Sequence, residues 1–290
     1  MTATIIDGRM LAKNIRQDLK EEIIRLIDKG VTPGLAVIIV GHDPASVTYV
    51  KAKAKACQEI GIYSDIFWMA EETTEAELLK QINDLNENPN IHGILVQLPL
   101  PPHISEQAVI NTIVPEKDVD GFHPVNAGKL MIGAEGFIPC TPHGIIKMIQ
   151  STGETIAGKH AVVIGRSNIV GKPMATLLLR EHATVTICHS RTKDLSKITK
   201  QADILVVACG CPGVIGREHV AEGAIVIDVG VNRKPEGRLV GDVRFDEVKE
   251  KAAYLTPVPG GVGPMTITML LYNTVQAAKQ AVQQEASHKC

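Results

Sequence analysis

Tyr49 and Lys53 are the first residues along the chain whose types and spacing suggest chemistry. A capping Asp43 followed by proline predicts that a helix begins there, and Gly61 predicts its end. Ser46, Tyr49 and Lys53 then form one stripe on this helix. The neighbouring apolar stripe consists of Val47, Val50, Ala54 and Cys57. We therefore expect Lys53 at the edge of the buried face, where partial loss of hydration favours a neutral amine that can act as a base. The alternative is a surface lysine beside a tyrosine.

Gln97 and two aspartates are further candidates for the same site. Gln97 lies at the end of a strand expected over residues 93–98, and the strand before the Lys53 helix is expected over residues 35–40. Because the carboxyl ends of parallel strands share one edge, Gln97 and Lys53 are expected in one crevice. Asp118 is most simply a turn residue. Asp120 is either a turn residue or an acceptor of paired hydrogen bonds from an amidine-like ring edge.

A glycine-rich segment and one cysteine leave two interpretations each. The segment P-V-P-G-G-V-G-P-M-T at 257–266 opens the last expected helix. It is either a helix start or a loop that lets a ligand approach the backbone closely. Cys140 precedes an expected helix start at Thr141. It is either a buried structural thiol or a helix-terminal thiol that lines a cleft.

The segment H-A-V-V-I-G-R-S-N-I-V-G-K-P at 160–173 has the pattern of a dinucleotide-binding strand, loop and helix. Gly165 ends the strand and Gly171 opens the helix, where the backbone must turn sharply and let a pyrophosphate approach. Free N–H groups at the helix N-terminus would bind that anion. Ser167 stands where the usual motif has its second glycine, so the surrounding strand–helix–strand context carries the interpretation.

The end of the next strand favours NADP over NAD. NAD sites usually carry an acidic residue at that position, whereas this chain has Ser190 and Arg191, which suit a 2′-phosphate. A solvated basic turn is the alternative. Val231 follows the strand expected over residues 224–229, so we expect it at the same sheet edge, on the nicotinamide side.

These candidates are positioned by two successive series of alternating strands and helices, which predict an α/β fold with parallel sheets. Strands are expected at 35–40, 62–68, 93–98, 160–164, 184–188, 203–208 and 224–229. Helices are expected from residue 43 to near 61, and at 75–86, 141–151, 171–181, 194–199 and 264–284. Residues 99–142 are expected to form a long functional loop and residues 233–245 an excursion. We expect two α/β domains with a cleft between them, the second a Rossmann-like parallel sheet, and a boundary near 140–150.

Composition narrows the class of protein. The chain has 290 residues, 44% of them hydrophobic, which is enough to bury a core. The formal charge of -2 and 3% aromatic residues argue against nucleic acid or a membrane as a partner. The six cysteines form no disulfide or zinc pattern, so reduced thiols and no metal are expected. No signal peptide or apolar span of about 20 residues is present.

Taken together, the motifs resemble the methylenetetrahydrofolate dehydrogenase/methenyltetrahydrofolate cyclohydrolase family in its bifunctional bacterial form. The resemblance covers essentially the whole chain. It depends on Y-V-K-A-K at 49–53, V-Q-L-P-L-P at 96–101, K-D-V-D-G-F at 117–122, P-C-T-P at 139–142, G-R-S-N-I-V-G-K-P at 165–173 and P-G-G-V-G-P-M-T at 259–266.

The resemblance implies NADP-dependent oxidation of 5,10-methylenetetrahydrofolate to the methenyl form, followed by hydrolysis to 10-formyltetrahydrofolate. Lys53 would be the key group for hydrolysis, with Gln97 supporting it, Tyr49 flanking the folate rings and Asp120 holding the pterin edge. The remaining implied substrate contacts are Leu98, Pro99, Pro259, Gly260, Gly261, Val262, Gly263 and Pro264. The implied cofactor contacts are Gly165, Arg166, Ser167, Ser190 and Val231.

The resemblance also implies a domain organisation and a setting. Residues 1–140 with 268–290 would form the folate-binding catalytic domain, and residues 141–267 the NADP-binding domain. A cytoplasmic homodimer serving purine, methionine and histidine biosynthesis is implied as well. Two other functions fit the outline: a dehydrogenase of another small acid, such as an amino acid or a shikimate-like acid, and a non-catalytic NADP sensor or scaffold. Neither would need Tyr49, Lys53, Gln97 and Asp120 in these contexts.

Overall fold

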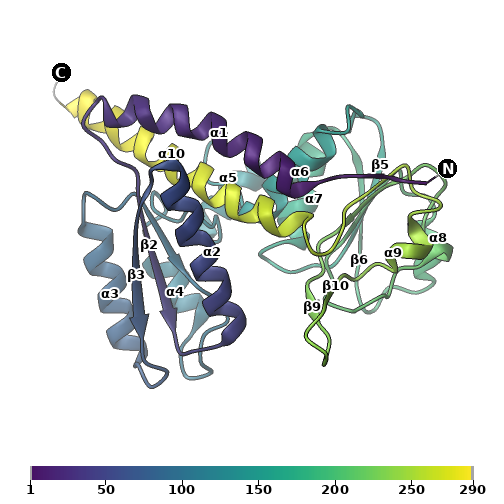
Figure 1. Ribbon diagram of the computed structural model, residues 1–290, viewed down its shortest axis with the longest axis horizontal. Helices are drawn as coiled ribbons and strands as arrows, with labels where there is room; N and C mark the ends of the chain where they lie inside the picture. The colour runs from purple at the N-terminus through teal and green to yellow at the C-terminus, as the bar shows by residue number, and fades with distance from the viewer. Residues whose placement is uncertain (1, 289–290) are drawn as a thin grey trace. The chain divides into compact units, whose positions relative to one another are not determined.

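The computed structural model describes residues 2–288, and the side chains of residues 2–283 (Figure 1). The chain forms two compact units. The first contains residues 2–13, 130–133 and 141–266, and the second contains residues 14–129, 134–140 and 267–288. The sequence left open whether the last residues are ordered: the last helix, α10 (Val262–His288), reaches His288, and residues 289 and 290 lie outside the described part.

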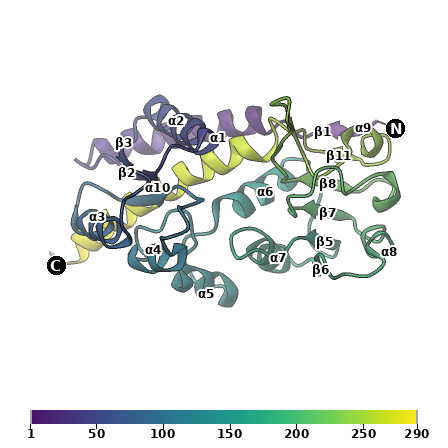
Figure 2. The ribbon, with the colours of Figure 1, turned by 90° about the horizontal axis from the view of Figure 1, so that it is seen from below.

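The second unit is built on a three-stranded parallel sheet with the order β3-β2-β4. Its strands are β2 (Gly34–Val40), β3 (Tyr63–Met69) and β4 (Gly93–Val96). Every residue of β2 is buried, as the unbroken apolar run predicted. The helices α2 (Pro44–Ile60) and α3 (Glu75–Glu87) connect the strands and lie on opposite sides of them (Figure 2).

Local caps set the ends of these helices. The Asp43 carboxylate accepts a hydrogen bond from Ser46 N at 2.8 Å, and Gly61 ends α2 in a left-handed conformation with φ of 91°. Thr74 and Glu77 form a capping box at the start of α3. Leu78 and Ile82 of α3 then pack against the sheet face that carries Ala36, Ile38 and Val40. These are the boundaries that the sequence predicted to within two residues.

The expectation of one long loop over residues 99–142 is wrong. Two short helices form there, α4 (Glu106–Thr112) and α5 (Pro124–Ile132). Their sequence signals are weak because the two helices have only 7 and 9 residues. Such short helices are held by tertiary contacts. The helix α1 (Gly8–Ile27) was not predicted either. Its buried positions recur every three to seven residues. These positions are Ala12, Leu19, Ile23 and Leu26.

The first unit contains a six-stranded, all-parallel sheet with the order β1-β11-β8-β7-β5-β6. Its strands are β1 (Thr4–Ile5), β5 (His160–Ile164), β6 (Thr184–Cys188), β7 (Ile204–Val207), β8 (Ile225–Asp228) and β11 (Tyr254–Leu255). The helices α7 (Gly171–Arg180) and α8 (Leu195–Thr199) lie on opposite sides of the strands (Figure 2). A further helix, α6 (Cys140–Gln150), begins one residue before the predicted position. The strands β5, β6, β7 and β8 match the prediction to within one residue, whereas the two-residue strands β1 and β11 were too short to be anticipated.

The expected excursion at residues 233–245 is a short antiparallel hairpin. Its strands are β9 (Asn232–Arg233) and β10 (Leu239–Val240), and it is followed by α9 (Phe245–Val248). A single 3-10 turn, η1 (Arg217–His219), lies between β7 and β8. The hairpin brings residues after β10 back to the carboxyl end of β8, which matters for the cofactor site below.

Candidate active site and cofactor site

Lys53 lies within the buried stripe of α2, and this corrects the expectation that it lies at the edge. The buried residues of α2 are Ser46, Val50, Lys53, Ala56, Cys57 and Ile60. Lys53 is only 6% exposed, which excludes an ordinary surface lysine. Its ammonium donates to Gln97 Oε1 at 2.9 Å and lies 5.3 Å from the centre of the Tyr49 ring. These two contacts offset part of the free-energy cost of burying the lysine charge. A pattern of apolar and polar residues along the chain contains no information about such contacts.

The Gln97 side chain is oriented by two hydrogen bonds. Its Nε2 donates to Leu98 O at 2.7 Å, so its Oε1 faces Lys53. Gln97 follows the end of β4 and Lys53 lies on the helix that follows β2, its neighbour in the sheet. The predicted crevice at the carboxyl edge of this sheet therefore brings Lys53, Gln97 and Tyr49 together.

Lys53 and Asp120 are electrostatically coupled, and burial moves each toward its neutral form. Burial lowers the pKa of Lys53, against the opposing effects of Asp120, Cys140 and Cys57. Burial raises the pKa of Asp120, and the Lys53 ammonium opposes this shift. The pKa of Tyr49 is also raised, chiefly by burial and then by Asp120 and Cys140. A lysine whose proton is held less tightly than usual is suited to move protons.

Cys140 is a buried thiol rather than a thiolate. It donates to Val119 O at 3.3 Å, and burial raises its pKa well above the usual value, with Asp120 adding to the effect. Asn273 of α10 donates to Val119 O at 2.8 Å and to Ile138 O at 3.0 Å. Cys140 and Asn273 thus both fix the carbonyl next to Asp120. Asn273 was not predicted as a site residue, and its only signal was an amide within an apolar stretch of a long helix.

Asp118 is the turn residue that the sequence indicated. Its carboxylate accepts hydrogen bonds from Phe122 N at 3.1 Å, His123 N at 2.8 Å and Asn126 Nδ2 at 2.8 Å. Burial raises its pKa to about 6, although all three hydrogen bonds oppose the shift. These contacts hold the loop that carries Asp120 against β4. Asp118 therefore supports the site through the backbone.

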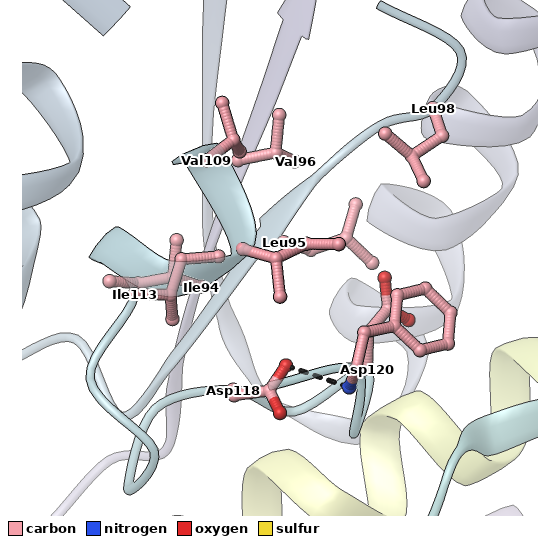
Figure 3. A pocket seen from close by; sticks show the side chains of 10 residues that line it. Ile94, Leu95, Val96, Leu98, Val109, Ile113, Asp118 and Asp120 are labelled. Carbon is pink, nitrogen blue, oxygen red and sulfur yellow. Dashed lines mark hydrogen bonds between the residues drawn. The ribbon is translucent and has the colours of Figure 1, made fainter. Parts of the chain in front are cut away.

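Asp118 and Asp120 lie beside a small pocket whose other lining side chains are apolar (Figure 3). Half of the lining residues belong to β4 and α4, and Leu98, Ile113 and Phe122 complete the apolar part. The figure shows Asp118 bonded to the Phe122 backbone nitrogen in the loop that also carries Asp120. A carboxylate at an apolar wall can bind a flat ring through paired N–H groups. The pocket has room for about one water molecule and none for a ring, so both alternatives for Asp120 stand.

The glycine-rich segment 257–266 belongs to the first unit, and its last residues form the first turn of α10. Gly260 has φ of 106°, and a side chain at Gly261 would lie 2.5 Å from Pro257 O. A side chain at Gly8 would meet Gly261 O at 1.9 Å. Tight backbone packing thus explains part of the glycine content. Pro259 is exposed and Gly260, Gly263 and Pro264 are half-buried, whereas Gly261 and Val262 are buried.

Gly165 ends β5 in a conformation that only glycine adopts readily. Its φ is 122°, and a side chain there would lie 2.1 Å from Ala208 O. A side chain at Gly171 would lie 2.3 Å from Gly165 O, so the loop and the start of α7 are in direct backbone contact. This close-packed turn at the carboxyl end of a central strand is the geometry that a dinucleotide site requires.

The free amides lie in the loop rather than in the first turn of α7, which refines the prediction. Ser167 Oγ accepts hydrogen bonds from Val170 N and Gly171 N, both at 3.2 Å. Among the described residues, nothing accepts from the backbone N–H groups of residues 166–169. Ser167, which replaces the second glycine of the usual motif, therefore caps α7 and leaves the loop amides for an anion.

The remaining cofactor candidates lie along the same sheet edge. Gly165 N donates to Cys188 O at 2.9 Å, which places the β5 loop beside the turn that carries Ser190 and Arg191. In this turn His189 N donates to Thr192 Oγ1 at 2.9 Å and Thr192 N donates to His189 O at 2.8 Å, and both Ser190 and Arg191 are exposed. Val231 is 60% exposed and follows β8. The order β8-β7-β5-β6 thus spreads these candidates along one edge, and the loops fit an extended dinucleotide.

The structure adds three observations on thiols, metals and membranes. The cysteines at 57, 140, 188, 209 and 211 are free thiols. Within the described residues, no three acidic, histidine or cysteine side chains are grouped so that they could hold a metal ion. No helix of this part of the chain has both the length and the apolar character needed to cross a membrane.

The fold and the loop geometry define a two-domain α/β protein whose first unit is a dinucleotide-binding sheet. Two family models match the chain. "Tetrahydrofolate dehydrogenase/cyclohydrolase, catalytic domain" covers residues 6–120, and "Tetrahydrofolate dehydrogenase/cyclohydrolase, NAD(P)-binding domain" covers residues 139–282. The chain belongs to the tetrahydrofolate dehydrogenase/cyclohydrolase family. The predicted family, two-domain α/β fold and bifunctional enzyme class with an NAD(P) cofactor are confirmed.

Individual relatives are similar over nearly the whole chain. The Bifunctional protein FolD of Geobacillus thermodenitrificans is 63% identical over 280 residues, which is 97% of this chain and 99% of that protein. The crystal structure of the FolD enzyme of Campylobacter jejuni is 54% identical with a TM-score of 0.94, covering 96% of this chain and 99% of that one. The Trypanosoma brucei dehydrogenase-cyclohydrolase, solved with NADP and an inhibitor, is 44% identical with a TM-score of 0.93, covering 97% and 99%.

Proposed function

We propose that this chain oxidises 5,10-methylenetetrahydrofolate with NADP and then hydrolyses the methenyl product to 10-formyltetrahydrofolate, with Lys53 as the proton-transfer group. The observation that carries the proposal is the buried Lys53 ammonium, bonded to Gln97 at 2.9 Å and coupled to Asp120. A sensor or scaffold protein would have no use for such a buried lysine. An enzyme that hydrolyses an amidinium ion needs a group that takes and returns protons.

Lys53 would act in both halves of the hydrolysis. Its neutral amine takes a proton as water forms a C–O bond to the one-carbon unit. The resulting ammonium then returns a proton to the ring nitrogen as the C–N bond breaks. Gln97 holds the amine in place in both states because its Oε1 accepts from either one. The burial that lowers the pKa of Lys53 makes its proton easier to release and so eases this exchange.

Substrate binding would use the side chains around Lys53. Asp120 would accept two hydrogen bonds from the pterin edge, while Tyr49 would flank the rings, and Leu98 and Pro99 would border them. The loop of Pro259, Gly260, Gly261, Val262, Gly263 and Pro264 would complete the substrate contacts. We further propose that residues 1–140 with 268–290 form the folate-binding domain and residues 141–267 the NADP-binding domain. The two family matches support the boundary near residue 140, and the compact unit that contains residues 267–288 supports placing the last helix with the folate-binding part, whereas residues 2–13 and 130–133 lie in the other unit.

Cofactor binding would use the carboxyl edge of the large sheet. Gly165, Arg166 and Ser167 would surround the pyrophosphate, which the free N–H groups of residues 166–169 would bind. Ser190 and Arg191 would bind the 2′-phosphate, and Val231 would contact the nicotinamide side. NADP supplies the hydride acceptor for the oxidation. The remaining requirement for that step is alignment, which these loops would provide.

The wider setting is also a proposal. We infer a cytoplasmic homodimer that supplies one-carbon units to purine, methionine and histidine biosynthesis. The family membership supports this setting.

One absorbance experiment tests the two activities. Purified protein is mixed with 5,10-methylenetetrahydrofolate and either NADP or NAD, and the methenyl absorbance is followed. We expect it to rise faster with NADP and then to decay faster than in buffer alone. If methenyl never forms, the dehydrogenase assignment is wrong; if it decays only at the buffer rate, the cyclohydrolase assignment is wrong.

A further inference from the structure

Two buried carboxylates lie at the carboxyl edge of the large sheet and have no role in the proposed chemistry. Asp228 is the last residue of β8, and Asp242 follows the hairpin strand β10. Asp228 is 4% exposed and Asp242 is fully buried. Among the described residues neither carboxylate has a salt-bridge partner, and the donors that they bind are backbone or side-chain groups of neighbouring loops.

Asp242 joins the loops that follow β7 and β8. Its Oδ2 accepts from Cys209 N at 2.9 Å and Gly210 N at 2.8 Å, and the Cys209 thiol lies 3.5 Å away. Its Oδ1 accepts from Asn232 Nδ2 at 2.9 Å. One carboxylate thus fixes the end of β7 and the residue just after Val231. Hydrogen bonds to a charged acceptor are among the stronger ones in a protein.

Asp228 fixes the residue just before Val231. Its Oδ1 accepts from Gly230 N at 3.0 Å and from Asp242 N at 2.9 Å, and its Oδ2 accepts from Val243 N at 3.0 Å. A side chain at Gly230 would lie 2.4 Å from the Asp242 carboxyl, and one at Gly241 would lie 1.7 Å from Asp228 Oδ2. The packing around both carboxylates leaves no room for adjustment.

Val231 is exposed between these two anchored neighbours. Burying two adjacent carboxylates costs free energy. Burial raises the pKa of Asp228 to about 6, and the neighbouring Asp242 adds a smaller contribution. Apolar residues would fill such a site at lower cost. The two carboxylates fix the backbone at the ends of β7 and β8, and this role would explain why they are buried despite the cost.

The strand order indicates which part of the cofactor would lie there. The proposed 2′-phosphate contacts follow β6 and the proposed pyrophosphate loop follows β5. The rest of an extended dinucleotide would therefore cross the ends of β7 and β8, where Gly210 and Val231 lie. We propose that Asp242 is a positioning residue that fixes the nicotinamide half of the NADP site by holding Cys209, Gly210 and Asn232. This inference depends on the proposed function of the sheet edge.

The test compares binding of whole NADP with binding of its adenine half. Asp242→Asn replaces one carboxylate oxygen with an NH₂ group, which then faces either the backbone donors of Cys209 and Gly210 or the Asn232 amide, and the milder Asn232→Ala removes only the tether beside Val231. Calorimetric titrations with NADP and with adenosine 2′,5′-bisphosphate are combined with both activity assays. Asp203→Asn is the control, because Asp203 Oδ2 accepts from His160 N at the opposite end of the same sheet.

We expect Asp242→Asn to weaken NADP binding about 10- to 100-fold and to lower the dehydrogenase kcat. Asn232→Ala should give a smaller effect of the same kind. Binding of adenosine 2′,5′-bisphosphate and the cyclohydrolase rate should stay within about twofold, as for distant sites. The control should match the wild type in every measurement.

Two results would overturn the inference. If both variants bind NADP as the wild type does, Asp242 positions nothing; if both lose the two ligands in parallel, it supports the fold only. A wild-type chain that binds no NADP would instead overturn the proposed function, and the inference with it.

Discussion

Replacing Lys53 with methionine is expected to remove the cyclohydrolase activity and leave the chain folded. A positioned general acid–base group typically contributes about 10²- to 10⁴-fold to a rate. Lys53 is the only ammonium that the described contacts place beside Gln97 and Tyr49, and it would serve in both proton transfers. We therefore expect hydrolysis to fall by about 10³-fold.

The effect on stability is expected to be small because two changes oppose each other. Burial lowers the pKa of Lys53, so the native state holds the ammonium at a cost, and methionine removes that cost. Methionine also leaves Gln97 Oε1 without its donor, which costs about 1–3 kcal/mol. The melting temperature should therefore move by only about a few degrees.

The assay follows decay of methenyltetrahydrofolate, corrected for the reaction in buffer, together with the melting temperature. Lys55→Met is the matched control, because Lys55 lies on the exposed side of the same helix. A Lys53→Met variant that hydrolyses at the wild-type rate would refute the role of the lysine. The role of Lys53 would also be refuted if Lys55→Met lost as much activity, or if the Lys53→Met variant lost activity only because it lost folded protein.

Three further predictions concern the cofactor site and the loop under Asp120. Arg191→Ala should raise the Kd for NADP about 10-fold, in line with one exposed charged contact, and leave that for NAD unchanged; an unaltered preference would contradict the 2′-phosphate role. Gly165→Ala should abolish NADP binding but not hydrolysis, because its φ of 122° and the 2.1 Å approach to Ala208 O leave no space for a methyl group; calorimetry would show this, and normal NADP binding would refute it. The pKa of Asp118 is raised from 3.8 to about 6, so its protonated form favours the native state at low pH and that contribution is lost as the pH rises through 6. The unfolding free energy of the wild type minus that of Asp118→Asn should thus fall by about 2 kcal/mol from pH 4 to pH 7 in urea titrations, and a difference that rises would refute the shift.

The boundaries of the central strands and helices could be predicted because their signals are local. Asp43, Gly61 and Gly165 each act on backbone within a few residues, so a short stretch of sequence contains the whole cause. Short elements escaped prediction for the opposite reason. The helices α4 and α5 and the strands β1 and β11 are too short to be stable alone, and tertiary contacts decide that they form.

The candidate site likewise has features that can be read along the chain and features that only tertiary contacts set. The sequence by itself identified Tyr49, Lys53, Gln97 and Asp120, because their types and the motifs around them can be read along the chain. It could not determine that Lys53 is buried, because burial of a charge depends on partners such as Gln97, 44 residues away. Nor could it show that Ser167 caps α7 and leaves the loop amides free, because the local spacing permits either arrangement.

Asp228 and Asp242 show this limit most clearly. In the sequence they are two acids, one after an apolar run and one beyond a glycine-rich hairpin. Only the tertiary structure brings their carboxylates to amides of three different loops, since strand order and hairpin path are set by packing across the sheet. The sequence thus determined most of the longer elements and the chemical groups that this protein has, and the tertiary structure decided which short elements form, which groups are buried and what they hold.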